Sequence, residues 1–224
     1  MIEHGDRLAV GLSGGKDSLS LLYALAHFRR VAPVEFELAA VTVSLGWGTD
    51  LSPAASFCES LGVPHHVEDT NIGKIVFDVR HEGNPCSLCA NMRRGALNNA
   101  ARRLGCNKVA LAHHLDDALE TLLMNVFFSG RATTFSPSTY LSRKDLTVVR
   151  PLVYCTEAMT LDVARTLDLP VIRADCPAAG KTSRQALKRL VSGLRGSNPR
   201  IDESILSSMK GLWGAGSGRR QAGG

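Results

Sequence analysis

Aromatic residues are scarce in this sequence: Phe, Trp and Tyr make up 5% of its 224 residues, whereas hydrophobic residues of all kinds make up 44%. We therefore expect an aliphatic core, large enough to form without disulfides or metals. No apolar run approaches the roughly 20 residues that a membrane span needs, and residues 1–6 lack the basic and then apolar pattern of a secretory signal. These absences predict a cytoplasmic protein with no membrane partner.

Two common phosphate-binding motifs are also missing. The segment Ser13–Ser18 reads Ser-Gly-Gly-Lys-Asp-Ser. A Walker A loop requires Gly where Val10 stands and Ser or Thr where Asp17 stands. The dinucleotide fingerprint requires Gly where this loop begins with Ser13. Any nucleotide chemistry of this loop must therefore belong to a different class.

Apolar runs of strand length alternate with segments of helical periodicity. This order predicts an α/β fold, a parallel sheet with helices on both faces, in one domain over residues 1–210. The Gly-rich residues 211–224 are expected to form a flexible tail. The expected strands are Arg7–Leu12, Phe36–Ser44, His65–Asp69, Lys108–Ala112, Val148–Val149 and Val171–Ile172, and the expected helices are Lys16–Phe28, Pro53–Leu61, Cys89–Leu104, Asp116–Phe128, Thr156–Leu167, Thr182–Leu194 and Ile201–Met209.

The loop Ser13–Ser18 lies between the first expected strand and a helix. Its two glycines let the backbone approach an anion, and the helix N-terminus supplies oriented N–H groups. Lys16 adds a cation, and Asp17 can hold Mg²⁺. A plain glycine turn is the alternative, but the full hexapeptide favours binding of the ATP phosphates at the carboxyl edge of the sheet.

A second polar segment, residues 112–121, follows the fourth expected strand and reads Ala-His-His-Leu-Asp-Asp-Ala-Leu-Glu-Thr. Carboxylates are favoured at a helix N-terminus, so Asp116 could simply cap the helix. We expect His113 and His114 to shape the site rather than to bind a metal.

Three of the six cysteines are candidate metal ligands. Cys86 and Cys89 form a C-x-x-C pair near a helix start, where thiolates are stabilised. Such a pair can be half of a zinc site, a redox dithiol or part of a cluster site. Zinc is disfavoured because no second C-x-x-C exists, and Cys176 before Pro177 offers a third thiolate of the iron–sulfur type. The remaining cysteines, 58, 106 and 155, are expected to be inert.

The hexapeptide resembles the PP-loop of the N-type ATP pyrophosphatases. Residues 112–121 resemble the Gly-His-x-x-Asp-Asp-x-x-Glu-Thr signature of PP-loop enzymes that act on tRNA, with Ala112 in place of Gly. The order of these motifs, together with residues 85–95 and 176–185, is similar to that of the tRNA 2-thiocytidine synthetase family from residue 1 to about 210. The best-known members carry a second C-x-x-C where this chain has only Cys176.

This resemblance implies a PP-loop ATP pyrophosphatase (adenine nucleotide alpha hydrolase-like) domain that uses ATP, Mg²⁺ and a [4Fe-4S] cluster. It implies sulfur insertion at the C2 oxygen of a cytidine in the tRNA anticodon loop, with a cysteine desulfurase as sulfur donor and a possible homodimer. The implied site residues are Gly11, Ser13, Gly14, Gly15, Lys16, Asp17, Ser18, Val43, Ala112 and Asp117 for ATP, Asp17, Arg93 and Asp117 for catalysis, and Cys86, Cys89 and Cys176 for the cluster.

The formal net charge is +5, a modest excess that is compatible with a nucleic-acid partner. Lys181, Arg184 and Lys188 recur every three or four residues and so share one helix face. We expect this face to contact RNA phosphates, although a solvated helix face would look the same. Three other functions stay open: a lysidine synthetase-like enzyme, a cluster-dependent sulfurtransferase acting on uridine or a small molecule, and a non-enzymatic nucleotide-binding or iron–sulfur sensor.

Overall fold

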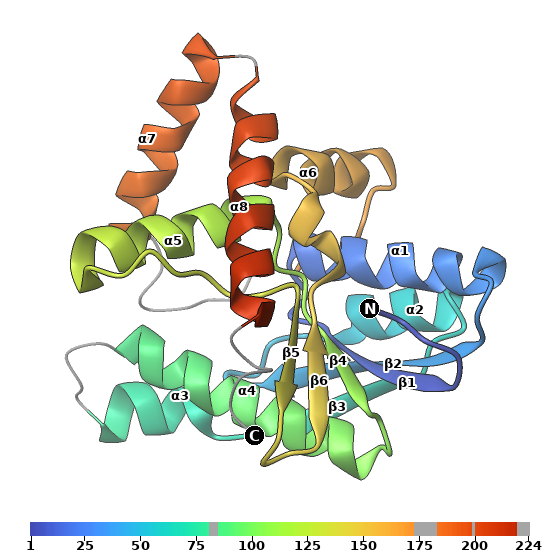
Figure 1. Ribbon diagram of the computed structural model, residues 1–224. Helices are drawn as coiled ribbons and strands as arrows, with labels where there is room; N and C mark the ends of the chain where they lie inside the picture. Colours follow the sequence, from blue (N-terminus) through green and yellow to red (C-terminus); the bar gives the residue numbers. More distant parts are fainter. Residues whose placement is uncertain (81–84, 173–182, 199, 219–224) are drawn as a thin grey trace.

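The computed structural model describes residues 1–80, 85–172, 183–198 and 200–218 (Figure 1). The strands are β1 (Asp6–Gly11), β2 (Phe36–Ser44), β3 (His65–Asp69), β4 (Lys108–Ala110), β5 (Ser138–Leu141) and β6 (Leu146–Val149). The helices are α1 (Lys16–Val31), α2 (Ser52–Ser60), α3 (Ile72–Lys74), α4 (Pro85–Arg103), α5 (Leu115–Ser129), α6 (Glu157–Thr166), α7 (Ser183–Ser197) and α8 (Ile201–Gly218). A π-helical turn extends α3 over Ile75–Val79, and a 3-10 turn covers Pro151–Tyr154.

The strands form one six-stranded sheet in the order β3-β2-β1-β4-β6-β5. All neighbours are parallel except β5, which pairs antiparallel with β6. The predicted α/β fold is therefore confirmed, with an edge hairpin that the sequence did not predict. The strand expected at Val171–Ile172 was wrong: the N–H of Ile172 donates to the carbonyl of Gly14 instead, at 2.9 Å.

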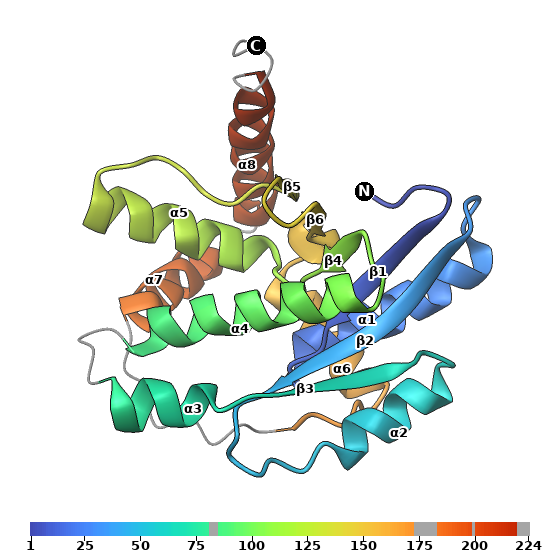
Figure 2. The ribbon, with the colours of Figure 1, turned by 90° about the horizontal axis from the view of Figure 1, so that it is seen from below.

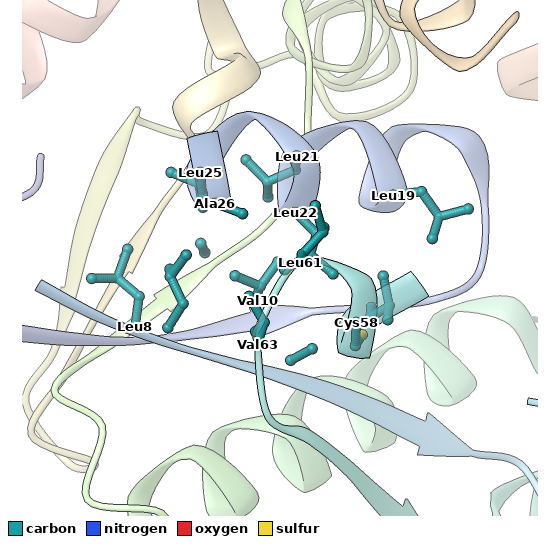
Figure 3. Close-up of a cluster of buried hydrophobic side chains, with 14 of the residues drawn as sticks. Leu8, Val10, Leu19, Leu21, Leu22, Leu25, Ala26, Cys58, Leu61 and Val63 are labelled. Atoms are coloured by element: carbon teal, nitrogen blue, oxygen red, sulfur yellow. The ribbon is translucent and has the colours of Figure 1, made fainter. Parts of the chain in front are cut away.

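Side chains of β1 alternate between two helical layers. Leu8 and Val10 point into a cluster formed with α1 and α2 (Figure 3), while Ala9 lies in a second cluster beneath α4. Figure 2 shows α4 lying across the sheet on the side away from α1. Because strand side chains alternate in direction, β1 is buried from both sides, which explains its unbroken apolar sequence. Its carboxyl end is thereby fixed at the centre of the molecule.

A third apolar cluster joins α5, the 3-10 turn and α8. Two residues of α8, Met209 and Trp213, are buried in this cluster. The indole N–H of Trp213 donates to the carbonyl of Phe135 at 2.8 Å. Helix α8 continues to Gly218, so the structure differs from the flexible tail expected from residue 211. The glycines lower helix propensity by up to about 1 kcal/mol each, but tertiary burial of Trp213 stabilises this helix nonetheless. Residues 219–224 lie outside the described part of the chain.

No helix within the described residues is long and apolar enough to cross a membrane.

Candidate functional site

The PP-loop turns sharply between β1 and α1. Gly14 has φ +78°, a conformation that side chains disfavour, and a Cβ there would lie 3.0 Å from the Cβ of Ile172. The hydroxyl of Ser18 accepts from the N–H of Ser13 at 3.2 Å and donates to the carbonyl of Gly15 at 2.9 Å. These contacts hold the loop in a compact shape around the N-terminus of α1, where free N–H groups favour anions.

A cavity of about 670 Å³ opens beside this loop at the carboxyl ends of β1, β2, β4 and β6. Its volume is in the range of small-molecule sites. The residues expected for ATP binding or catalysis that line it are Gly11, Ser13, Gly15, Asp17, Ser18, Val43, Arg93, Ala112 and Asp117. The other lining residues are Leu12, Val41, Ala90, Arg94, Leu97, Leu111, His113, Thr121, Phe135, Arg150 and Arg184.

Two residues expected to bind ATP, Gly14 and Lys16, do not line this cavity. The ammonium of Lys16 contacts the carboxylates of Asp17 at 2.7 Å and Glu157 at 3.2 Å. The hydroxyl of Thr160 donates a hydrogen bond to the carboxylate of Asp17, with 2.5 Å between the two oxygens. Lys16 and Asp17 thus form one charged corner with α6, a helix that the sequence motifs did not connect to the site.

Glu157, at the first position of α6, joins this corner to α7. Its carboxylate contacts the ammonium groups of Lys16 at 3.2 Å and Lys188 at 2.7 Å. Burial alone would raise the pKa of Glu157, but the bonds to Lys188 and Lys16 outweigh burial and hold the pKa below its ordinary value. The glutamate therefore stays ionised, which fixes both lysines beside the loop.

His114 caps α5, the helix that carries the two aspartates. Its Nδ1 accepts from the N–H of Asp117 at 3.3 Å, and the carboxylate of Asp117 accepts from the N–H of His114 at 3.1 Å. This reciprocal pair is a capping box, and it requires the His114 tautomer with the free Nδ1 lone pair. The alternative that Asp116 caps the helix is wrong, because Asp116 instead accepts from the N–H of Glu157 at 2.7 Å.

Asp117 faces the cavity and Asp116 faces away from it into the protein. The Asp116 side chain is 5% exposed and contacts the guanidinium of Arg195, with 2.5 Å between Oδ1 and Nη1. Adjacent carboxylates therefore have different surroundings: one lies at the ligand cavity, and one is satisfied by a backbone N–H and a cation. This division favours Asp117 over Asp116 as the group that meets a ligand.

The basic face of α7 is directed at the protein's own carboxylates. Arg184 contacts Glu120 at 3.2 Å and lies 3.9 Å from Asp117, while Lys188 contacts Glu157 at 2.7 Å. The expectation that this face contacts RNA phosphates stays a prediction: Arg184 and Lys188 each pair with a carboxylate of the protein, while 50% and 49% of their side chains remain exposed. Lys181, the third member of that face, lies outside the described residues.

Glu120 is the carboxylate that Arg184 covers. Burial raises the pKa of Glu120, and the charge of Arg184 opposes that shift. The side chain of Glu120 is 7% exposed. Glu120 belongs to the segment that resembles the tRNA-enzyme signature, and its ion pair with Arg184 joins α5 to α7.

Cys86 and Cys89 lie in the first turns of α4, immediately before the cavity-lining residues Ala90 and Arg93. Cys86 is exposed and Cys89 is partly buried. Residues three apart share one face of a helix, so both thiols fit a common metal ligand set. No group of three His, Cys, Asp or Glu ligands occurs within the described residues, and the expected third ligand, Cys176, lies outside them.

The three cysteines expected to be inert lie away from the cavity. Burial raises the pKa of Cys58 to about 11 and also raises the pKa values of Cys106 and Cys155. A raised pKa lowers the thiolate fraction at neutral pH, and the thiolate is the reactive and metal-binding form. These surroundings support the separation of the cysteines into two groups. Cys86 and Cys89 are candidate ligands, and the other three are not.

Phe135 and Arg150 are cavity residues that the sequence reasoning missed. Arg150 follows the last residue of β6, and Phe135 precedes the antiparallel strand β5. The guanidinium of Arg150 lies over the Phe135 ring, 4.9 Å from its centroid. The rule that ligands bind at the carboxyl ends of parallel strands could have indicated Arg150, but Phe135 carries no comparable local signal.

The chain was compared with known proteins. A family model described as the PP-loop domain matches residues 3–192. The tRNA-cytidine(32) 2-sulfurtransferase of Geobacter sulfurreducens is 42% identical over 213 residues, covering 93% of this chain and 83% of the relative. The protein of the same name from Pelobacter propionicus is 41% identical over 216 residues, covering 95% of this chain and 80% of the relative.

A solved structure shares both the fold and part of the sequence. The U34-tRNA thiolase NcsA from Methanococcus maripaludis, described with its [4Fe-4S] cluster, aligns with a TM-score of 0.75 and 26% identity. The alignment covers 94% of this chain and 72% of NcsA. With its PP-loop, its aspartate pair and its cysteine pair at one edge of the sheet, the chain belongs to the PP-loop family and, within it, to the tRNA sulfurtransferases named tRNA-cytidine(32) 2-sulfurtransferase.

Proposed function

We propose that this protein uses ATP to replace the C2 oxygen of a cytidine in tRNA with sulfur, at anticodon-loop position 32 as the names of its relatives indicate. One observation carries the proposal: a single cavity is lined by the PP-loop, by Asp117 and by Arg93 of the helix that begins with Cys86 and Cys89. ATP chemistry and thiol chemistry therefore meet at one edge of the sheet.

The first step is adenylation. The C2 oxygen attacks the α-phosphorus of ATP, the bond from that phosphorus to the bridging oxygen breaks, and pyrophosphate leaves. The N–H groups of the PP-loop stabilise the charge on pyrophosphate. Lys16 does not line the cavity, but its ammonium adds a positive charge beside the loop, and Asp17 is the carboxylate that would hold Mg²⁺. Asp17 fits this role because its carboxylate lines the cavity.

The second step exchanges the activated oxygen for sulfur. A new C2–S bond forms, the C2–O bond breaks, and AMP leaves with the original oxygen. Cys86, Cys89 and Cys176 would hold a [4Fe-4S] cluster, which would supply the incoming sulfur. Arg93, which follows Cys89 by one helical turn and lines the cavity, stabilises the negative charge on the departing AMP.

We further propose that the sulfur comes from a cysteine desulfurase and that two copies of the chain associate. A lysidine synthetase-like reaction is the main competitor, since it would use the same PP-loop and Asp117. It would not require Cys86 and Cys89 at the start of α4, and their position beside the cavity favours sulfur transfer.

The decisive experiment compares anaerobically purified wild-type protein with the variants Cys89→Ala and Cys176→Ala, and with Cys155→Ala as the matched control. Iron and acid-labile sulfide are measured, and nucleosides of tRNA from a deletion strain carrying each gene are analysed. We expect the control to match the wild type and the other two variants to lose both iron and 2-thiocytidine. An iron-free wild type that still thiolates tRNA would disprove the cluster, and full activity of Cys89→Ala would favour the lysidine-type reaction.

A further inference from the structure

The cavity has two sides that differ in character. Gly11, Val43 and the PP-loop lie at the ends of β1 and β2, whereas Arg150 and Phe135 lie at the end of β6 and beside β5. In the strand order β1-β4-β6, the end of β6 is two strands from β1, which is about 10 Å at the usual strand spacing. Of the residues expected to bind ATP, Ala112 and Asp117 follow β4, between the two sides, and none belongs to β5 or β6.

Arg150 is a partly buried cation that has no anionic partner among the described residues. Its Nη1 donates to the carbonyl of Ser136 at 2.6 Å and lies 3.4 Å from the hydroxyl of Thr139, but no carboxylate among the described residues forms an ion pair with it. Its Nε is buried and has no hydrogen-bond partner. Burial and the nearby charge of Arg94 lower the pKa of Arg150 to about 10. An unpaired buried guanidinium is costly, so such groups normally have an anionic partner.

Arg94 and His113 are two further cavity residues near Arg150. Arg94, exposed at the mouth of the cavity, donates to Asn91 at 2.6 Å and likewise has no ion pair within the described ranges. His113 packs against Phe135 with 5.1 Å between ring centroids, and its Nδ1 is buried without a partner. By contrast, Arg184 on the other wall is paired with Glu120. Arg150 and Arg94 are thus two neighbouring cations of the cavity wall that have no carboxylate partner in the described part of the chain.

We propose that Arg150 and Arg94, with His113 beside them, form a subsite for a phosphate oxyanion, and that this oxyanion is the backbone phosphodiester of the tRNA nucleotide being modified. Guanidinium groups match phosphate oxygens through paired N–H donors. Phosphate contacts of this kind fix the position and register of a nucleic acid. The inference rests on the function proposed above, because it assigns the β6 side to the tRNA and the β1 side to ATP.

ATP is the other source of phosphate oxyanions near this site. Its phosphates have the N–H groups of the PP-loop and α1 as dedicated donors, at the end of β1. The β6 side is offset from that loop by two strands, and the target nucleotide must enter the same cavity from another direction for its C2 oxygen to reach the α-phosphorus. The separation therefore favours RNA over ATP as the partner of Arg150 and Arg94.

The first test measures tRNA and ATP affinities separately for wild type, Arg94→Gln and Arg150→Lys, with Arg143→Gln as control. Arg143 is an exposed cation in the β5–β6 turn, at the opposite end of the hairpin from Arg150. We expect Arg94→Gln to weaken tRNA binding about tenfold and to reduce the salt slope by about one, with ATP binding unchanged. Arg150→Lys keeps the charge but loses the guanidinium fork, so tRNA binding should also weaken. Its thermal unfolding reports whether the contact with Ser136 is needed for folding.

The second test uses an anticodon stem–loop RNA in which the phosphodiester next to the target cytidine is a neutral methylphosphonate. The neutral linkage should weaken RNA binding by the wild type and by Arg143→Gln. It should weaken RNA binding by Arg94→Gln only slightly, because that variant has already lost its contact with the phosphodiester. Equal losses in all three proteins would overturn the assignment, as would a weakened ATP affinity with intact tRNA affinity in Arg94→Gln. If the wild type binds ATP but no tRNA at all, the proposed function itself fails instead.

Discussion

The guanidinium of Arg195 on α7 contacts the carboxylate of Asp116 at the start of α5, with 2.5 Å between Nη1 and Oδ1. Asp116 immediately precedes Asp117, the candidate catalytic residue. Arg195 also contacts Asp202 of α8 at 2.7 Å, so one side chain joins α5, α7 and α8. In Figure 1, α7 rises from the level of α5 and α8 runs down past it, and Arg195 links both helices to the start of α5.

Replacing Arg195 with Met should destabilise the protein, because Asp116 would keep a buried charge without a cation. Loss of one partner of a fully buried pair costs about 3–5 kcal/mol. Arg195 is 30% exposed at its side chain, so we expect about 2 kcal/mol. Urea unfolding measures the change. Arg189→Met, an exposed cation on the same helix, is the control and should leave the stability unchanged; equal stability of the two variants would refute the importance of the pair.

The variant Asp117→Asn distinguishes the role of Asp117 in the reaction from its role in capping α5. The amide oxygen of Asn can still accept from the N–H of His114, so the cap and the stability should persist. The negative charge at the cavity is lost, and we expect pyrophosphate release in the presence of tRNA to fall by on the order of 10²–10³, as for other preorganised charged groups. Asp162→Asn, at an exposed position of α6, should retain activity. Normal turnover by Asp117→Asn would remove this residue from the mechanism.

His113 should make stability depend on pH. Burial lowers its pKa from 6.5 to about 4, with Asp117 opposing the shift and Arg150, Arg184 and His114 adding to it. The unfolded chain therefore binds a proton that the folded protein excludes, so stability is lost as pH falls from 6.5 towards 4. The loss is at most about 3 kcal/mol. His113→Phe keeps the contact with Phe135 but cannot titrate, so its unfolding free energy should decline less over this range; parallel curves for the two proteins would contradict the assignment.

Trp213→Ala should loosen α8 from the body of the protein. The side chain is 8% exposed and its N–H donates to the carbonyl of Phe135, a cavity residue. Truncation of a buried Trp costs about 3–5 kcal/mol. Lys210→Ala, on an exposed position of the same helix, is the control. A chain ending at residue 210 should be destabilised in the same way, and wild-type stability of that shortened chain would restore the interpretation of residues 211–218 as a dispensable tail.

The local sequence was sufficient to predict those features that lie within one short segment of the chain. The PP-loop needs two glycines between a strand and a helix, and the C-x-x-C pair needs only one turn of helix, so Ser13–Ser18, Cys86 and Cys89 could be recognised from spacing. The alternation of strands and helices likewise predicted the parallel sheet, because apolar periodicity is a local property. The strand β5 escaped recognition because its four residues, Ser138–Leu141, alternate between exposed and partly buried positions.

The sequence by itself therefore determined the fold class, the PP-loop between β1 and α1, and the pair of thiols at the start of α4. Only the tertiary structure decided what the other charges do. Arg184 and Lys188, although half exposed, pair with Glu120 and Glu157 of the protein itself, whereas Arg150 is left at the cavity without a carboxylate in the described part of the chain. Helical spacing shows which cations share a face, but their partners come from distant segments, and the free energy of a charge depends on the partner and burial that folding gives it.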